Sequence, residues 1–397
     1  MPKWSRLGLG PRVAAGIVAA LVGVGLLAAP TGAHADDTRD GQWMIDALDL
    51  PDAWKTTKGK GVTVGTVDTG VDAGHPDLKG SVEPGKSFID DSDGRSDPEG
   101  HGTSAASLVA GHGHGDDAGV MGVAPEAKIL PAQLELGEDA KIAEFADAIR
   151  WLADNGADII LIEAVHVLEN SDEHAAVKYA AIERGIPVVT GVGNTGTDYS
   201  GLGKPPSRTG TLYPAGYEEV IGASATNSDG KLSDLSMYGT NVTVAAPGES
   251  VTAAKPGKGY TEFGGTSAAS AVTAGVLALL KAEYPDETRM ELTWRLTELI
   301  TDAGEQGDDD KYGFGIVDPA AALTEDPGPL PDELKDPEPT GTYPDESSKS
   351  DKDAAEETLN GSGSSALPIV VVGITVVALA VLVLLMALLL RRRRRSP

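Results

Sequence analysis

The chain has 397 residues, of which 60 are acidic and 32 are basic, and it contains no cysteine. The lack of thiols excludes disulfide frameworks, cysteine-ligated zinc, iron–sulfur clusters and a cysteine nucleophile. Both ends lack acidic residues, so the segment from Asp36 to Ser365 holds all 60 of them beside 24 basic residues, a net charge of −36. Such a surface repels phosphate backbones, which argues against nucleic acid as a partner.

The first 35 residues have the layout of a secretory signal. Basic residues precede an apolar run from Val13 to Ala29, and Ala33-His34-Ala35 forms a small-x-small cleavage site. We therefore predict a signal peptide at 1–35, followed by a short N-terminal extension at 36–60. An uncleaved N-terminal anchor is the alternative.

The other end has the layout of a membrane anchor. Leu367 to Leu390 is free of charge, and a helix of that length spans about 36 Å against about 30 Å of hydrocarbon. We predict a transmembrane helix at 366–390 and a basic cytoplasmic tail at 391–397, because clustered arginines stay on the cytoplasmic side. Residues 326–365, rich in Pro, Ser and acidic residues, are expected to form a disordered linker. The expected location is the cell membrane, single-pass, with the domain between the two ends extracellular.

Strands and helices alternate in the segment 61–325. Apolar, β-rich runs predict strands at 62–68, 159–165, 187–190, 220–223 and 242–245. Apolar residues at helical spacing predict helices at 139–155, 173–184, 267–283 and 288–301. The pattern is typical of one α/β domain whose mostly parallel sheet is covered by helices on both faces.

Three residue types needed for catalysis by a hydroxyl occur in glycine-flanked turns. Asp68 ends a strand in VDTG, His101 begins a helix in EGHGTSAAS, and Ser267 begins a helix in GGTSAAS. A serine needs a base to take its proton, and the base needs a carboxylate to orient it. Asn194 in VGNTG, together with the Ser267 backbone N–H, can donate to a developing oxyanion. The order Asp, His, Ser is one of the three known triad orders.

These motifs, with GVAPEAKIL, YPAGYEEVIGASA, VTVAAPGESV and YGFGIVDPAAAL, resemble the subtilisin-like serine proteases from about Gly61 to Leu323. The resemblance implies the subtilisin-like fold and endopeptidase activity, with Asp68, His101 and Ser267 as the triad and Asn194 as the oxyanion donor. The layout of signal, linker and anchor is similar to the membrane-anchored mycosin-type subtilases of actinobacteria, which accompany type VII secretion systems. Protein or peptide substrates, the membrane and a secretion-system complex are the partners it implies.

The chain departs from the family pattern before the domain and in the cleft. The extension of about 25 residues is too short for a folding prodomain, so either none is needed or the segment wraps the domain. The family's Ser-x-Gly strand here reads Glu163-Ala164-Val165. Val165 is expected to narrow the pocket for the side chain before the cut bond, and Glu163 adds a carboxylate that is costly to bury unpaired. A second hypothesis is therefore a catalytically weak scaffold that binds peptides or a secretion complex.

No cofactor-binding or metal-binding residues are predicted. Structural calcium is common in the family, but spacing alone does not place its ligands in this chain. His112 and His114, in GHGHGDD, are interpreted as part of a solvated loop. His166 and His174 are interpreted as surface polar residues.

Overall fold

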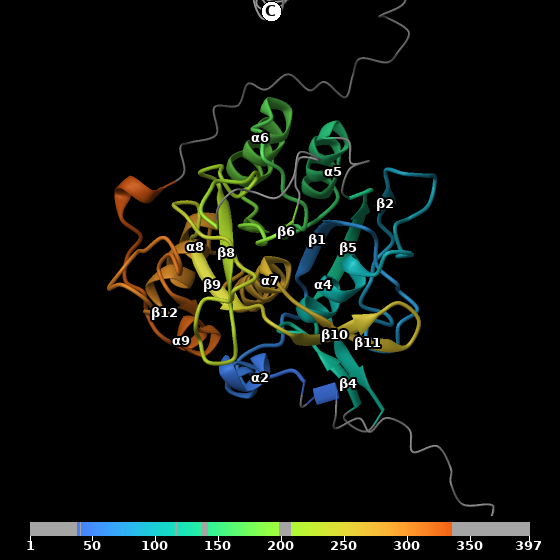
Figure 1. Cartoon of the computed structure of the whole chain (residues 1–397), viewed down its shortest axis with the longest axis horizontal. Helices are drawn as coiled ribbons and strands as arrows, with labels where there is room; N and C mark the ends of the chain where they lie inside the picture. The colour runs from blue at the N-terminus through green and yellow to red at the C-terminus, as the bar shows by residue number, and fades with distance from the viewer. Residues whose placement is uncertain (1–37, 40, 116–117, 137–141, 198–207, 336–397) are drawn as a thin grey trace, which may run out of the picture. The chain divides into compact units, whose positions relative to one another are not determined.

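The computed structural model describes residues 38–39, 41–115, 118–136, 142–197 and 208–335 (Figure 1). The predicted signal peptide (1–35), transmembrane helix (366–390), cytoplasmic tail (391–397) and most of the linker lie outside these residues. Among the helices that the structure describes, none is both long enough and apolar enough to cross a membrane.

A nine-stranded sheet lies at the centre of the described domain, in the order β12-β13-β9-β8-β7-β6-β1-β5-β2. Neighbouring strands are parallel except for the antiparallel pair β12–β13. The strands are β1 (Thr63–Asp68), β2 (Lys86–Ser87), β5 (Lys128–Gln133), β6 (Ile159–Ile162), β7 (Val188–Gly191), β8 (Val220–Thr226), β9 (Val244–Pro247), β12 (Ile300–Thr301) and β13 (Ile316–Val317). Two hairpins stand apart from this sheet, β3 (His112–His114) with β4 (Ala118–Met121), and β10 (Val251–Lys255) with β11 (Gly259–Phe263).

Helices cover both faces of the sheet, because side chains alternate between the two faces of each strand. In β6, Ile159 and Leu161 belong to the apolar cluster that contains α4 (His101–Ala110) and α7 (Thr266–Glu283). Ile160 and Ile162 belong to a second cluster, with α5 (Ile142–Asp154) and α6 (Ser171–Lys178), which lie side by side (Figure 1). All four β6 side chains are fully buried, which explains the continuous apolar run in the sequence.

The predicted α/β order is confirmed, with shifts at some boundaries. The strand predicted at 159–165 ends at Ile162, so Glu163-Ala164-Val165 lies outside the regular ladder. The helix predicted at 173–184 consists of α6 and a π-helical turn, Tyr179–Glu183. The last predicted helix is shorter, because α8 (Arg289–Glu298) is followed by β12. Short helices complete the described chain: α2 (Met44–Ala47), α3 (Leu50–Ala53), α9 (Pro319–Thr324) and the 3₁₀ turn Asp332–Leu334.

The N-terminal extension packs against the domain. Gln42 exchanges two hydrogen bonds with the Met121 backbone of β4, at 2.8 and 2.9 Å, and Trp43 Nε1 donates to the Glu249 carbonyl at 3.0 Å. Met44 and Leu50 are fully buried in the cluster that contains α4 and α7. The described part of this segment therefore lies against the domain, as expected if it wraps the domain.

Candidate active site

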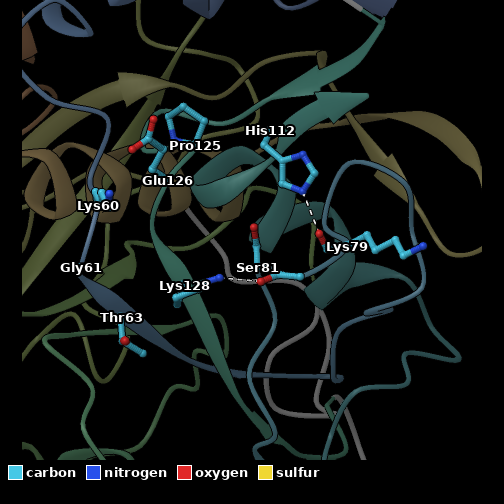
Figure 2. A pocket seen from close by; sticks show the side chains of 10 residues that line it. Lys60, Gly61, Thr63, Lys79, Ser81, His112, Pro125, Glu126 and Lys128 are labelled. Carbon is cyan, nitrogen blue, oxygen red and sulfur yellow. Dashed lines mark hydrogen bonds between the residues drawn. The ribbon is translucent and has the colours of Figure 1, made fainter. Parts of the chain in front are cut away.

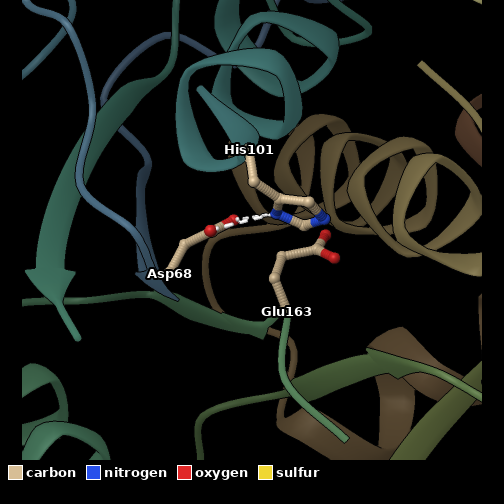
Figure 3. Close-up of side chains that lie close together, drawn as sticks. All are labelled: Asp68, His101 and Glu163. Atoms are coloured by element: carbon tan, nitrogen blue, oxygen red, sulfur yellow. Dashed lines mark hydrogen bonds and ion pairs between the residues drawn. The ribbon is translucent and has the colours of Figure 1, made fainter. Parts of the chain in front are cut away.

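Asp68 and His101 meet where β1 ends and α4 begins (Figure 3). The Asp68 carboxylate is buried, and both of its oxygens lie 3.0 Å from His101 Nδ1. Its Oδ1 also accepts the Thr69 backbone N–H at 2.6 Å. A carboxylate has no proton to give, so Nδ1 is the donor, and Nε2 is the ring atom that can take a proton from a nucleophile. The His101 side chain is 32% exposed and has the Phe263 ring edge-on at 5.1 Å.

A second buried acid, Asp97, holds the start of α4. It accepts five hydrogen bonds of 2.6 to 3.2 Å, from Thr69 Oγ1, the backbone N–H groups of Glu99, Gly100 and Thr103, and Thr103 Oγ1. The first turn of a helix has backbone N–H groups without partners in the helix, and a carboxylate there satisfies several at once. Sequence analysis missed Asp97. Its position four residues before His101, in DPEGH, was the available signal.

Gly102 explains why the helix can approach β1 so closely. A Cβ at this position would lie 2.1 Å from the Gly70 carbonyl oxygen and 3.1 Å from Asp68 Cγ. Its backbone N–H donates to Thr69 Oγ1 at 3.0 Å. Only glycine leaves room for this approach, so the HGT motif is a packing requirement of the Asp68–His101 contact.

Ser267 is the second residue of α7, and Asn194 holds the turn in front of it. Asn194 Oδ1 accepts the Thr266 backbone N–H at 2.8 Å and Thr266 Oγ1 at 3.2 Å. Gly265 has a φ of +87°, and a Cβ there would lie 2.4 Å from Asn194 Oδ1. The structure thus places Asn194 against the residue before Ser267, with a glycine that permits the contact.

Glu163 lies at the triad. It follows β6 directly, and because Val67 and Ile162 are paired in register, Glu163 stands beside Asp68. Its side chain is buried, and its Oε1 accepts Ser270 Oγ at 3.1 Å. Within the described chain, its Oε2 has no hydrogen-bond partner. Figure 3 shows the carboxylate turned toward the His101 ring.

The acids around His101 change its protonation. Burial is the largest single influence and lowers the pKa of the ring, but the charge and hydrogen bond of Asp68, with the charges of Glu163 and Asp97, raise that pKa from 6.5 to about 9. Burial raises the pKa of Glu163 from 4.5 to about 8, opposed by the His101 charge and by two serine hydroxyl groups, those of Ser267 and Ser270. Ser267 is therefore close to the carboxyl. No hydrogen bond joins Ser267 Oγ to His101 in this part of the chain, a contact that often forms only with substrate bound.

Asp68, His101 and Glu163 each place one possible ligand atom within 4.8 Å of the others. A cation at Nδ1 would have to replace the two contacts with Asp68 described above. We therefore interpret the three side chains as a proton-sharing cluster, since Asp68 and His101 already pair without a metal.

Other histidines in the described part of the chain are in structural contacts. His114 lies in the β3–β4 hairpin and bonds through Nδ1 to buried Asp77 at 2.5 Å, so the expected solvated loop at 112–114 is a strand instead. His166 Nε2 bonds to Glu173 at 2.9 Å, and His174 Nε2 bonds to Glu219 at 3.0 Å. Both of these rings are half-buried, which corrects the expectation of surface polar residues.

A separate cavity of about 550 Å³ lies at the amino ends of β1 and β5, beside Thr63 and Lys128 (Figure 2). Lysines line it, but they do not converge on one point. Lys128 Nζ donates to the Gly80 carbonyl at 2.5 Å, and Figure 2 shows Lys79 extending away from Lys128. The cavity is at the opposite edge of the sheet from Asp68 and contributes nothing to the triad.

Known proteins are similar to this chain in fold and in sequence. The model of the subtilase family matches residues 59–315. Mycosin-1 of Mycobacterium tuberculosis is 33% identical over 353 residues, which cover 77% of this chain and 78% of that protein. The minor extracellular protease Epr of Bacillus subtilis is 31% identical over 293 residues, 73% of this chain but 43% of Epr. The solved structure of the serine protease MycP1, described as an essential component of the type VII (ESX-1) secretion system, matches with a TM-score of 0.62 and 31% identity, over 72% of this chain and 88% of that one.

Proposed function

The chain belongs to the subtilase family as a mycosin-type, subtilisin-like serine endopeptidase, and we propose that it cleaves protein or peptide substrates through an acyl-enzyme formed on Ser267. The observation that carries the proposal is the pairing of His101 Nδ1 with both oxygens of buried Asp68, close to the helix that begins with Thr266 and Ser267. This is the base and orienting acid that a serine nucleophile requires.

In the proposed mechanism, neutral His101 accepts the Ser267 proton as Oγ attacks the substrate carbonyl. Asp68 keeps the ring in the Nδ1–H form and stabilises the imidazolium. Asn194 and the Ser267 backbone N–H donate to the oxyanion. His101 then returns its proton to the leaving amine, and water hydrolyses the acyl-enzyme by the same route.

The proposed setting is the outer face of the cell membrane. In this proposal residues 1–35 are removed as a signal peptide, 36–60 form the extension, and 61–325 form the peptidase domain. The acidic linker at 326–365 tethers the domain to a transmembrane helix at 366–390, and the basic tail at 391–397 is cytoplasmic. The likeness to Mycosin-1 and MycP1 supports an association with type VII secretion, which we include in the proposal.

A catalytically weak scaffold is the second candidate function. The observation in its favour is Glu163, a buried acid in contact with the triad cluster that the mechanism does not need. A subtilase of this kind would bind extended peptides in its cleft and turn them over slowly. The presence of all three triad residues favours the protease over the scaffold.

Labelling with a fluorophosphonate tests the protease proposal. The full chain and the Ser267→Ala variant are compared from neutral to alkaline pH, with Ser228→Ala, an exposed serine after β8, as the matched control. We expect labelling of the parent and the control, and none of Ser267→Ala, because the probe reacts only with an activated hydroxyl. Equal labelling of Ser267→Ala would remove Ser267 from the mechanism, and an unlabelled parent at every pH would favour the scaffold.

A further inference from the structure

Glu163 is a buried acid beside the triad without an assigned role. Its Oε1 is held by Ser270 Oγ at 3.1 Å, while its Oε2, in the described chain, has no hydrogen-bond partner. One of its oxygens lies within 4.8 Å of a His101 ring nitrogen. In Figure 3 the carboxylate approaches the ring beside the nitrogen that does not bond Asp68. That nitrogen is Nε2, the atom that must accept the Ser267 proton.

We propose that Glu163 is a positioning residue that holds a second proton on His101, at Nε2, and so keeps Ser267 from being activated until that proton is lost. This inference rests on the proposed triad function and names a regulation of the same site. Glu163 thereby extends the inactive protonation state of the protease into the alkaline range, and the protease becomes active as the pH rises further.

The balance of the acylation step shows why the extra proton blocks it. The bond between Ser267 Oγ and the substrate carbon forms while the carbonyl electron pair moves to oxygen, and the Oγ proton passes to Nε2. An Nε2 that already bears a proton has no electron pair for this transfer. Once ionised, above its raised pKa of about 8, the Glu163 carboxylate stabilises the doubly protonated imidazolium, because opposite charges attract strongly beside a buried group.

The groups around His101 come from five parts of the chain. Asp68 ends β1, Asp97 precedes α4, and Glu163 follows β6. From β11, Phe263 brings an uncharged ring, and α7 contributes the hydroxyl groups of Ser267 and Ser270. Asp68 orients the ring and Asp97 holds the α4 turn, so both are needed for the geometry. Glu163 makes no hydrogen bond to His101, so its charge can be removed while the ring keeps its partner.

The test compares the full chain with Glu163→Gln and with Glu169→Gln as a matched control. The Gln variant keeps the size and an oxygen for Ser270 but loses the charge, and Glu169 is a mostly exposed acid on the same segment, 3.8 Å from His174. The rate of fluorophosphonate labelling of Ser267 is measured across neutral and alkaline pH. In Glu163→Gln we expect the rise of this rate to move to lower pH by about 1 to 3 units, the effect of one nearby opposite charge. Between about pH 8 and 9, where Glu163 of the parent is ionised while His101 is still protonated, the variant should then label up to about tenfold faster. Glu169→Gln should match the parent.

Two outcomes of labelling overturn the proposal. If the pH dependence of the labelling rate is unshifted in Glu163→Gln, the Glu163 carboxyl does not influence the protonation of His101. Loss of labelling at every pH, in a variant that melts like the parent, would make Glu163 itself a proton acceptor.

A second measurement does not depend on activity. The His101 C2–H resonance is titrated by NMR in the parent, in Glu163→Gln and in Glu163→Ser, which carries the residue usual in the family and serves if the first variant fails to fold. If Glu163 holds the Nε2 proton, the titration midpoint of His101 should lie well above 6.5 in the parent and lower in the variants. A parent midpoint near 6.5, or equal midpoints, would overturn it. If the midpoint of the parent is raised but no probe labels Ser267 at any pH, the effect of Glu163 on His101 is supported and the protease function is contradicted.

Discussion

Ser270 Oγ donates a hydrogen bond of 3.1 Å to Glu163 Oε1, and Ser270 lies one helical turn after Ser267 on α7. The same hydroxyl group lies 2.9 and 3.0 Å from the carbonyl oxygens of Thr266 and Ser267. A buried acid is thereby fastened to the helix that carries the proposed nucleophile. Its protonation should therefore influence folding stability as well as chemistry.

The free energy of unfolding should fall as the pH rises from about 4.5 to about 9. Glu163 and His101 both have pKa values in the folded protein above their ordinary values of 4.5 and 6.5, so over this range the folded state binds more protons than the unfolded state. Their stabilising contribution is complete at low pH and is lost as the pH passes through about 8 and about 9. Urea unfolding at several pH values measures how the free energy of unfolding depends on pH. Glu163→Gln should show a flatter dependence, and an equally steep one would contradict the raised pKa of Glu163.

Asp97→Asn should destabilise the protein and slow Ser267 labelling. The amide presents N–H groups where the carboxylate accepted five hydrogen bonds, which leaves buried donors unpaired at a cost of about 1 to 3 kcal/mol. His101 loses its fixed position because the first turn of α4 is loosened. Thermal melting and labelling rates check both effects. Asp93→Asn, an exposed acid in the preceding loop, is the control and should change neither.

Asn194→Ala should reduce peptide turnover by about 10²-fold to 10³-fold with little change in substrate affinity, the usual effect of losing one oxyanion donor. Steady-state kinetics of the variant give kcat and KM separately. Asn155→Ala, at an exposed asparagine after α5, controls for the substitution itself. An unchanged kcat would show that Asn194 serves only the Thr266 turn that its Oδ1 holds.

Val165→Gly should broaden the cleavage specificity. Val165 follows the end of β6 and is half-buried, and in the resemblance to the family it replaces a glycine on the wall of the pocket for the residue before the cut bond. The parent should prefer small residues there, such as Ala or Gly, and the variant should gain large ones. Cleavage of a peptide library by the parent and by the variant measures the two specificities. A parent that prefers Phe or Leu would place the pocket wall elsewhere.

Membrane topology is tested on intact cells. A protease added outside should release the domain by cutting between Asp326 and Ser365 and should leave the arginine-rich end protected. Antibodies to tags at 36–60 and at the C-terminus follow the two products. Protection of the whole domain would reverse the proposed orientation.

The α/β order and the residues of the candidate triad were visible in the sequence. Strand and helix periodicities are local, so the apolar run at Ile159 and the helical face around Phe145 indicate their elements without any knowledge of the partners. Asp68, His101 and Ser267 stand in glycine-flanked turns whose glycines permit close approaches, and such turns leave a signature in the chain itself.

The environment of the triad was decided only by the tertiary structure. The resemblance to the family showed that Glu163 replaces a serine, and its place in the Ser-x-Gly strand suggested the wall of the cleft. The parallel pairing of β1 with β6 places it beside Asp68 instead, and Ser270, 107 positions away along the chain, holds its carboxyl under His101. Asp97 is only partly such a case, since Thr69 lies 28 positions away whereas its other four donors lie within six residues of it. Burial and charge neighbours are properties of packing between distant segments, and it is these that set the pKa of a side chain.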